Sequence, residues 1–336
     1  MKYYLLSKYD GNKYNAGSKA LLDIYSILEK KGYKAIVLNK KGGRNSCKKF
    51  LFHLLNVITI LVKIRKKDTV FINYPNWTLD FKGRILNRII VMLSSHVQIL
   101  VHDLNSIRFG NPFDEDIKLL NKAELLIVLT PSMRSFLEKH GVSNKMVLIN
   151  VFDYLSEEEN IPVLDEKSIV FAGNLEKSGF LLPLSKTNFK SLHFDVYGLG
   201  FPESMEWGTI TYNGVFSPDK ISQIKGTWGL VWDGDSIDSC AGPLGEYLML
   251  NTPHKTALYI AAQKPVIVWN QSAIKDYIED NYLGISIGSI TELESKLDSL
   301  TPETKERIKE HVKIYSQKIR RGETLSTLLD EHEKSQ

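Results

Sequence analysis

The feature that most constrains this chain is a regular alternation of short apolar segments with longer amphipathic ones. Strand-like runs in the first half lie at 3–7, 33–39, 69–73, 97–102, 124–129 and 146–149. Helix-like segments separate them, and the clearest lie at 18–31, 83–94 and 131–140. Because strands that alternate with helices of about ten or more residues form βαβ units, we predict a parallel sheet covered by helices on both faces.

The stretch from 152 to 167 interrupts this alternation, since it contains acidic residues and a proline but no sustained apolar period. The alternation then resumes, with strand-like runs at 168–172, 192–197, 208–212, 228–232, 265–269 and 284–287. Helices are expected at 217–225, 253–263, 272–280, 290–299 and 302–316. We therefore predict an α/β chain of two Rossmann-like domains, 1–152 and 168–316, facing across a cleft. A helix or tail at 317–336 is expected to pack back toward the first domain.

Charge divides the chain in the same place. Residues 1–150 hold 25 basic and 11 acidic residues, a balance of +14, whereas the remainder holds 18 basic and 28 acidic, a balance of −10. The two domains are therefore expected to face different partners. The two cysteines, Cys47 and Cys240, lie far apart and indicate no disulfide framework, which favours a cytoplasmic protein. The N-terminus reads as a strand and lacks the pattern of a signal peptide.

One apolar segment, 50–64, has basic residues on both sides, at Lys48-Lys49 and at Arg65-Lys66-Lys67. It is too short and too polar to span a bilayer. A buried helix that covers the sheet is the interpretation we favour. A helix lying on an anionic membrane surface, at the inner face of the plasma membrane, stays open beside it.

Polar residues follow the strands of the second domain, where open α/β sheets bind ligands. Gly173, Asn174 and Lys177 come after the strand at 168–172, and they fit either a diphosphate contact or an ordinary turn. Asp233 and Asp235 follow the strand at 228–232, and they fit either a divalent metal site or an Asx-type turn. We favour the turn, because two-domain folds of this kind usually neutralise phosphate with basic side chains and a helix N-terminus.

The strongest candidate site in the second domain is the start of the helix predicted at 253–263. Thr252 is a good N-cap and Pro253 fits the first helical position, which leaves Lys255 in the first turn, opposed to the helix dipole. A phosphate between Lys255 and the free N–H groups would explain this position, although a tolerated surface lysine would also fit it. The candidate nucleotide-sugar contacts from the strand end at 232 onward are Asp233, Asp235, Gly245, Glu246, Thr252, His254, Lys255 and Thr256.

In the first domain, His102 and Asp103 end one strand, and Tyr74, Asn76 and Trp77 end another. An imidazole and a carboxylate at a strand end are general-base candidates, although Asp103 could instead cap a turn. Flat aromatic side chains at Tyr74 and Trp77 fit sugar stacking or core packing equally well.

At the run that begins at Trp228, WGLVWDGDSIDSCAGPLGEYLMLNTPHKTALYIAAQKPVIVW, the sequence resembles bacterial β-1,6-galactofuranosyltransferases of O-antigen and capsule synthesis. It is also similar to the glucosyltransferases that extend GlcNAc on serine-rich adhesins. Supporting pieces of the pattern are FAGN at 171–174, YPNW at 74–77, His102-Asp103 and NAGSKA at 15–20. The likeness spans nearly the whole chain and implies a GT-B fold.

The resemblance implies transfer of a hexose, with galactofuranose from UDP-galactofuranose as the first choice, to a sugar of a surface polysaccharide or lipid-linked glycan, with inversion. It places the diphosphate at Lys255 and Lys177, and Phe216 stands where the family has a nucleotide-contacting tyrosine. Asn15, Gly17, Tyr74, Asn76 and Trp77 are the acceptor-binding candidates. No metal or other cofactor is expected.

Three alternatives remain beside this function. One is a UDP-glucose-dependent glucosyltransferase acting on GlcNAc of a glycoprotein, and another is a non-catalytic glycan- or nucleotide-binding partner on the same fold. A sugar-nucleotide epimerase would need further carboxylates around the sugar, which we do not find. A nucleic-acid partner is disfavoured because no helix-turn-helix, RRM or zinc pattern is present. Homo-oligomers remain open.

Overall fold

The computed structural model describes residues 1–7, 16–38, 46–75, 80–104, 107, 113–158, 167–202 and 207–336. The chain divides into two compact units, each with its own sheet. Unit 1 comprises Met1–Asn12, Leu21–Ile149 and Leu325–Gln336. Unit 2 comprises Lys13–Ala20 and Asn150–Thr324.

The sheet of unit 1 is parallel throughout and has the strand order β2-β1-β3-β4-β5-β6. Its strands are β1 (Lys2–Ser7), β2 (Lys34–Leu38), β3 (Thr69–Tyr74), β4 (His96–Val101), β5 (Leu125–Val128) and β6 (Met146–Leu148). The central strands are buried along their length, as expected of a sheet with helices on both faces. All six strands lie where the sequence predicts them.

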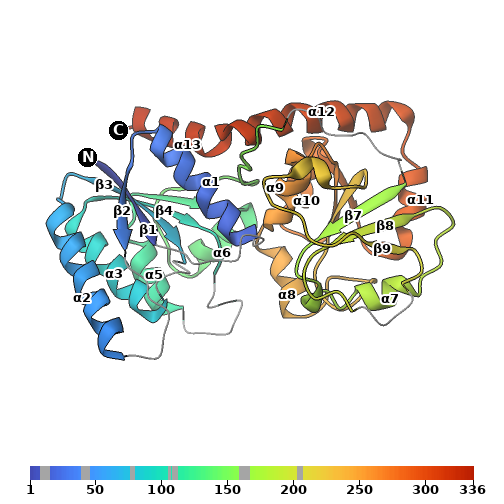
Figure 1. Ribbon diagram of the computed structural model, residues 1–336. Helices are drawn as coiled ribbons and strands as arrows, with labels where there is room; N and C mark the ends of the chain where they lie inside the picture. Colours follow the sequence, from blue (N-terminus) through green and yellow to red (C-terminus); the bar gives the residue numbers. More distant parts are fainter. Residues whose placement is uncertain are drawn as a thin grey trace. The chain divides into compact units, whose positions relative to one another are not determined.

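Unit 1 contains the helices α1 (Ala16–Lys30), α2 (Ser46–Lys63), α3 (Asp80–Leu93), α5 (Asp114–Leu120), α6 (Pro131–Lys139) and α13 (Glu323–Lys334), and Figure 1 shows them around the sheet. The first residues of α1 and of α13 belong to unit 2. Helix α6 has a sequence-encoded start, because the Thr130 hydroxyl accepts a hydrogen bond from the N–H of Met133 and Pro131 follows the cap.

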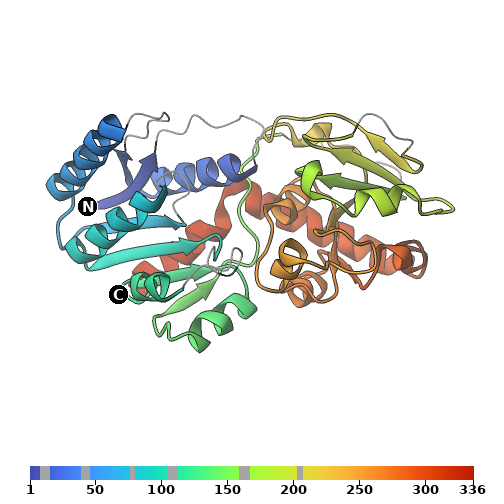
Figure 2. The same cartoon turned by 90° about the horizontal axis from the view of Figure 1, so that it is seen from below.

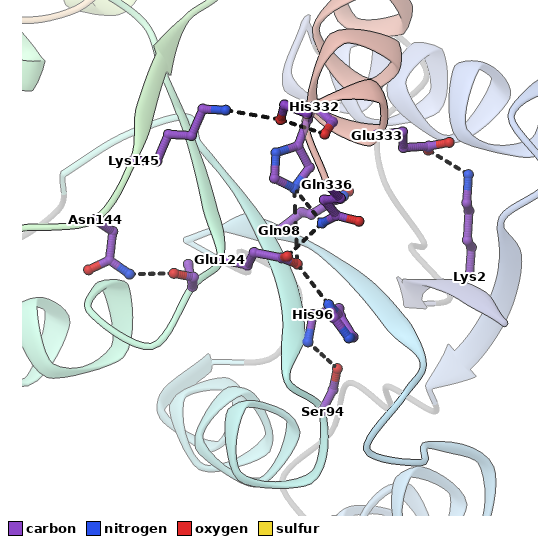
Figure 3. A network of polar contacts seen from close by, with 12 residues as sticks. Lys2, Ser94, His96, Gln98, Glu124, Asn144, Lys145, His332, Glu333 and Gln336 are labelled. Atoms are coloured by element: carbon purple, nitrogen blue, oxygen red, sulfur yellow. Dashed lines mark hydrogen bonds and ion pairs between the residues drawn. The ribbon is translucent and has the colours of Figure 1, made fainter.

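The last helix, α13, is joined to unit 1 by a polar network (Figure 3). Glu124 is its centre: its carboxylate lies 3.2 Å from Nδ1 of His96 and accepts a 2.5 Å hydrogen bond from the Gln336 side chain. Lys2 forms an ion pair of 2.5 Å with Glu333, and Lys145 donates to the Ser335 hydroxyl at 3.2 Å. Residues more than 200 positions apart in the chain thus belong to one compact unit.

The sheet of unit 2 is also parallel, with the order β12-β11-β10-β7-β8-β9. Figure 2 shows the three of these strands that come first in the chain, β7 to β9, in yellow-green to yellow. The strands are β7 (Ser168–Ala172), β8 (His193–Tyr197), β9 (Ile210–Tyr212), β10 (Trp228–Val231), β11 (Val266–Trp269) and β12 (Gly284–Ile287). These positions also agree with the sequence prediction.

The helices of unit 2 are α7 (Leu181–Ser185), α8 (Pro243–Glu246), α9 (His254–Ala261), α10 (Lys275–Asp280), α11 (Leu293–Asp298) and α12 (Pro302–Arg321). In the described part of unit 2, 3-10 turns accompany them at η1 (Leu175–Lys177), η2 (Ile221–Gln223), η3 (Tyr247–Met249) and η4 (Ile290–Glu292). Helix α12 ends at Gly322, whose φ of +77° forms a left-handed C-cap.

The helix predicted at 217–225 is wrong, because only the short turn η2 forms there. Backbone carbonyls of this segment accept hydrogen bonds from distant side chains: Pro218 from the Tyr154 hydroxyl at 2.8 Å, and Gln223 from the Tyr197 hydroxyl at 3.3 Å. These tertiary contacts hold the segment in a loop although its local pattern favours a helix.

Each sheet has one point where the order of its strands reverses direction. The reversal lies between β1 and β3 in unit 1, and between β7 and β10 in unit 2. Open α/β sheets bind ligands outside the carboxyl ends of the strands at such points. The topology therefore makes the region where Gly173 follows β7 and Trp232 follows β10 the candidate ligand site of unit 2.

Candidate functional site

Packing between α9 and β10 brings the start of α9 to the reversal point of unit 2. A Cβ added at Gly229 in β10 would lie 2.2 Å from the ring of Tyr259 in α9, so only glycine lets the helix lie this close to the strand. Tyr259 is fully buried, and its hydroxyl oxygen accepts a 2.8 Å hydrogen bond from the N–H of Ala172 in β7. One side chain thus joins α9 to both strands of the reversal point.

Helix α9 begins one residue later than the sequence suggests. Pro253 is the N-cap and no side chain caps the helix, so the prediction of Thr252 as N-cap is wrong. Thr252 is buried instead, and Pro253 after it has extended backbone before the first helical residue. The hydroxyls of Thr252 and Thr256 are buried without a hydrogen-bond partner in the part of the chain that the structure describes. The start of α9 therefore combines a helix N-terminus without a side-chain cap with two buried hydroxyl groups, which suits an anion.

Lys255 already has an anionic partner within the protein. Its Nζ donates to Oδ1 of Asp233 at 2.8 Å and to the carbonyl of Trp232 at 3.0 Å, and it lies 4.7 Å from the ring centroid of Phe171. The lysine is 15% exposed and the aspartate 30%. A lysine in this first turn therefore does not by itself require a bound phosphate, because Asp233 offsets the unfavourable dipole.

Gly173 lies beside Lys255, with the lysine Cδ 3.9 Å from a Cβ added at the glycine. Asn174 is exposed, and its side chain accepts a 3.1 Å hydrogen bond from the N–H of Glu176, so it caps the turn η1. Lys177 ends η1 and is exposed. The structure thus places Gly173 against Lys255 and puts Asn174 and Lys177 on an exposed turn after the same strand.

The two aspartates of the predicted Asp-x-Asp motif contact different groups. Asp233 pairs with Lys255, whereas Asp235 lies against the turn after η1, since a Cβ at Gly179 would be 2.3 Å from its Oδ1. Among the described residues, no three His, Cys, Asp or Glu side chains are grouped to hold a metal ion. The ion pair of Asp233 is a direct competitor for any cation that would bind this carboxylate.

Gly245 and Glu246 lie in the short helix α8. Gly245 is buried, and a Cβ there would lie 2.3 Å from the carbonyl oxygen of Cys240 and 2.8 Å from that of Asp233. Its lack of a side chain therefore lets α8 pack against the loop that carries Asp233. Glu246 is exposed at the end of α8 and is accessible to a ligand.

His254 and Phe216 are both in aromatic contacts of unit 2. The imidazole of His254 lies 5.4 Å, centroid to centroid, from both Phe152 and Tyr154. Phe216 packs edge-on to Tyr197 at 5.4 Å. Both side chains thus have packing roles that the sequence analysis did not foresee.

In unit 1, both candidate bases, His102 and Asp103, follow the carboxyl end of β4, which pairs with β3. Asn73 and Tyr74 of β3 lie in register with Leu100 and Val101 of β4, and the N–H of His102 donates to the Tyr74 carbonyl at 2.7 Å. Tyr74 is buried, whereas His102 and Asp103 are partly exposed. Tyr74 thus belongs to the core, whereas His102 and Asp103 lie at the edge of the sheet that the carboxyl ends of its strands form. Asn15, Asn76 and Trp77 lie outside the described residues, and Gly17 lies in the first turn of α1.

A buried amide orients the imidazole of His102. Nε2 of His102 donates to Oδ1 of Asn73 at 2.9 Å, and Asn73 also forms a hydrogen bond with Tyr25. Burial lowers the pKa of His102 to about 4, so the imidazole is neutral at pH 7. Asn73 was not among the predicted site residues, because an asparagine inside a strand gives no signal until the strands are paired.

We expect His102 to titrate near pH 4 in the folded protein rather than at its ordinary value of 6.5. Between these values the unfolded chain binds a proton that the folded chain does not, so the contribution of His102 to stability is lost as the pH falls through this window. NMR titration of the imidazole resonances, assigned with His102→Gln, measures the pKa. The variant should also lose part of the acid sensitivity of unfolding. A His102 resonance that titrates near 6.5 would contradict the burial argument.

Comparisons with known proteins agree with this architecture. Models of the N-terminal and C-terminal domains of the glucosyltransferase 3-like family match residues 2–151 and 169–332. The β-1,6-galactofuranosyltransferase WbbI of Escherichia coli K12 is 32% identical, over 98% of this chain and 97% of that protein. The chain belongs to the glucosyltransferase 3-like family. The resemblance stated from the sequence is confirmed, and the chain is a nucleotide-sugar-dependent hexosyltransferase.

One further relative and one solved structure are also similar to this chain. Glucosyltransferase 3 of Streptococcus parasanguinis is 24% identical over 81% of this chain and 80% of that protein. The structure of sucrose-phosphate synthase from Thermosynechococcus elongatus aligns with a TM-score of 0.64 at 12% identity, over 100% of this chain and 99% of that one. At such low identity this second likeness concerns the fold alone. The predicted fold class, GT-B with two Rossmann-like domains, is confirmed.

Proposed function

We propose that this glycosyltransferase transfers galactofuranose from UDP-galactofuranose, with inversion, to a sugar of a surface polysaccharide or lipid-linked glycan. Peripheral contact with an anionic membrane is part of the proposal. The observation that carries it is Lys255 at the start of α9, beside Gly173 and at the strand reversal of unit 2. The identity with the galactofuranosyltransferase over nearly the whole chain supports the choice of sugar.

The diphosphate of the donor is proposed to bind at the start of α9. Backbone N–H groups, the two buried threonine hydroxyls and the ammonium of Lys255 supply donors for phosphate oxygens. Lys177 supplies a second, exposed cation. As UDP departs, its growing negative charge is stabilised by these groups, which lowers the barrier to transfer.

The reaction proposed is a single displacement. The acceptor hydroxyl gives its proton to a base in unit 1, its oxygen forms a bond to the anomeric carbon, and the bond from that carbon to UDP breaks. Asp103 and His102 are the candidate bases. Burial disfavours the imidazolium form that His102 would have to adopt, so Asp103 is the stronger candidate. No metal ion takes part in this scheme, because lysines and a helix N-terminus meet the charge of the diphosphate.

A second candidate function is glucosyl transfer from UDP-glucose to GlcNAc of a glycoprotein, supported by the similarity to glucosyltransferase 3 of Streptococcus parasanguinis. A non-catalytic partner built on the same fold is the remaining alternative. The two transferases differ in the donor that they use, and a non-catalytic partner would turn over none. A screen of donors therefore separates the three functions.

We expect purified protein to release UDP from UDP-galactofuranose in the presence of glycan acceptors, at least about tenfold faster than from UDP-glucose or UDP-galactose, a discrimination of about 1.4 kcal/mol. Excess EDTA should leave this rate unchanged. Preference for UDP-glucose with GlcNAc acceptors would favour the second function, and no release from any donor would favour the non-catalytic one. Loss of activity in EDTA that manganese restores would reassign Asp233 as a metal ligand.

A further inference from the structure

Helix α2 of unit 1 has an apolar face directed away from the protein core. Six large apolar side chains are each at least 44% exposed, and we call them the apolar stripe: Phe50, Leu51, Leu54, Ile58, Leu61 and Val62. Their spacing of three, four and one residues places them on one side of the helix. In Figures 1 and 2, α2 lies on one flank of the sheet of unit 1 with α3 beside it.

The opposite side of α2 faces the core. Ile60 and Ile64 are buried, as is the polar side chain of Asn56. A helix that buries an asparagine while it exposes leucine, isoleucine and phenylalanine does not follow the usual distribution of polar and apolar residues. The exposed side is therefore an interaction surface, since large exposed apolar patches on a protein generally bind something.

The charge around the apolar stripe identifies the partner. Residues 30–67 contain twelve Lys and Arg residues and no Asp or Glu. Past the C-terminal end of the stripe, Lys63, Arg65, Lys66 and Lys67 are exposed, and Lys48 and Lys49 lie at the other end of the helix. Arg65 also donates to the carbonyl of Leu61 at 3.2 Å and so helps to end the helix.

A second copy of the chain does not suit this surface. Two α2 helices packed through the stripe would bring basic ends together in either orientation, and the segment offers no carboxylate to pair with them. An anionic bilayer satisfies both features, since its headgroups pair with the basic ends while the stripe enters the acyl boundary. No helix in the described part of the chain is long and apolar enough to cross a membrane.

We propose that α2 lies flat on an anionic membrane, with the apolar stripe inserted among the lipids and the basic ends at the headgroups. This inference rests on the membrane contact of the proposed function and names the surface that makes it. It does not rest on the proposed sugar or linkage, and its test needs neither donor nor acceptor. Binding has two components, apolar insertion and charge attraction, and only the second is screened by salt.

Flotation of the full chain with phosphatidylglycerol vesicles tests the proposal, with phosphatidylcholine vesicles as the neutral comparison. We expect binding to phosphatidylglycerol at low salt and little binding to phosphatidylcholine. Leu54→Gln with Ile58→Gln should lower the ratio of bound to free protein at least about tenfold, because two inserted side chains become polar. Met92→Gln is the matched control, since Met92 is 84% exposed on α3 and lies outside the stripe.

The charge component has its own pair of variants. Neutralising Lys63, Lys66 and Lys67 to Gln should weaken binding at least about tenfold. The same change at three exposed lysines elsewhere in unit 1, Lys118, Lys122 and Lys139, should weaken it far less. Unchanged thermal midpoints show that the variants fold. Undiminished binding by the Leu54/Ile58 variant, or equal effects of the two lysine triples, would overturn the proposal. So would a wild type that stays unbound and instead dimerises through α2 in sedimentation experiments.

Discussion

Lys255→Ala should lower turnover at least about tenfold and weaken UDP binding by a similar factor, about 1.4 kcal/mol. The ammonium lies at the uncapped start of α9, beside Gly173, where a diphosphate would meet both. Stability should change little, because Asp233 is 30% exposed and can be solvated when its partner is removed. We therefore expect a shift in the thermal midpoint of no more than about 3 °C. UDP titration calorimetry and initial rates measure the two effects.

Asp233→Asn provides the sharpest comparison for this variant. It removes the carboxylate that pairs with Lys255, yet its amide oxygen can still accept the hydrogen bond. If Lys255 serves the diphosphate, this change should leave UDP binding as tight as in the wild type or tighter, since a nearby negative charge is gone. Lys275→Ala is a matched control, because Lys275 also forms ion pairs in unit 2, with Asp276 and Glu279. Wild-type turnover in Lys255→Ala would contradict the phosphate assignment and make its ion pair a purely structural one.

The strands of this protein could be predicted from sequence, and the contacts of its site could not. Runs such as Ile169-Val170-Phe171 are buried on both faces, so their composition alone identifies them. The pairing of Lys255 with Asp233 depends on how closely α9 approaches β10, which Gly229 and Tyr259 decide. The sequence alone does not show which aromatic ring will pack against a glycine in a strand.

Helix α2 shows the same limit in another form. Its sequence is apolar on most sides, so hydrophobic periodicity cannot tell which side faces the core. We favoured a buried helix from the sequence, and the structure buries only one side of it, where Asn56, Ile60 and Ile64 lie. The remaining apolar side chains are exposed because the protein core covers only the side of α2 that carries these three residues. Tertiary packing, and not local propensity, thus decides what this segment presents to solvent.

The site of unit 1 was predicted in part. His102 and Asp103 lie at a strand end as expected, but the residue that orients the imidazole, Asn73, lies on the neighbouring strand 29 positions earlier in the chain. Register between β3 and β4 brings the two together. Such a pair becomes visible only when the strand order is known, which the alternation of elements does not specify.

Asp103→Asn should reduce turnover by about 100-fold or more while UDP binding stays within about twofold of the wild type, the usual result of removing a general base. The amide keeps the shape of the carboxylate but cannot take up a proton from the acceptor hydroxyl. His102→Gln should have a smaller effect, about tenfold, because burial holds the imidazole neutral and a glutamine can still donate to Asn73.

The two variants together separate a base from a positioning residue. If Asp103 is the base, Asp103→Asn lowers kcat at every pH, whereas His102→Gln raises KM for the acceptor more than it lowers kcat. If His102 is the base, His102→Gln is instead the variant that lowers kcat at every pH, and Asp103→Asn is the one that mainly raises KM. The acid limb of the wild-type pH–rate profile should then follow the pKa of about 4 that burial gives the His102 imidazole. Should both variants keep wild-type turnover, the proton must leave through another group, and the assignment of the base to this strand end is wrong.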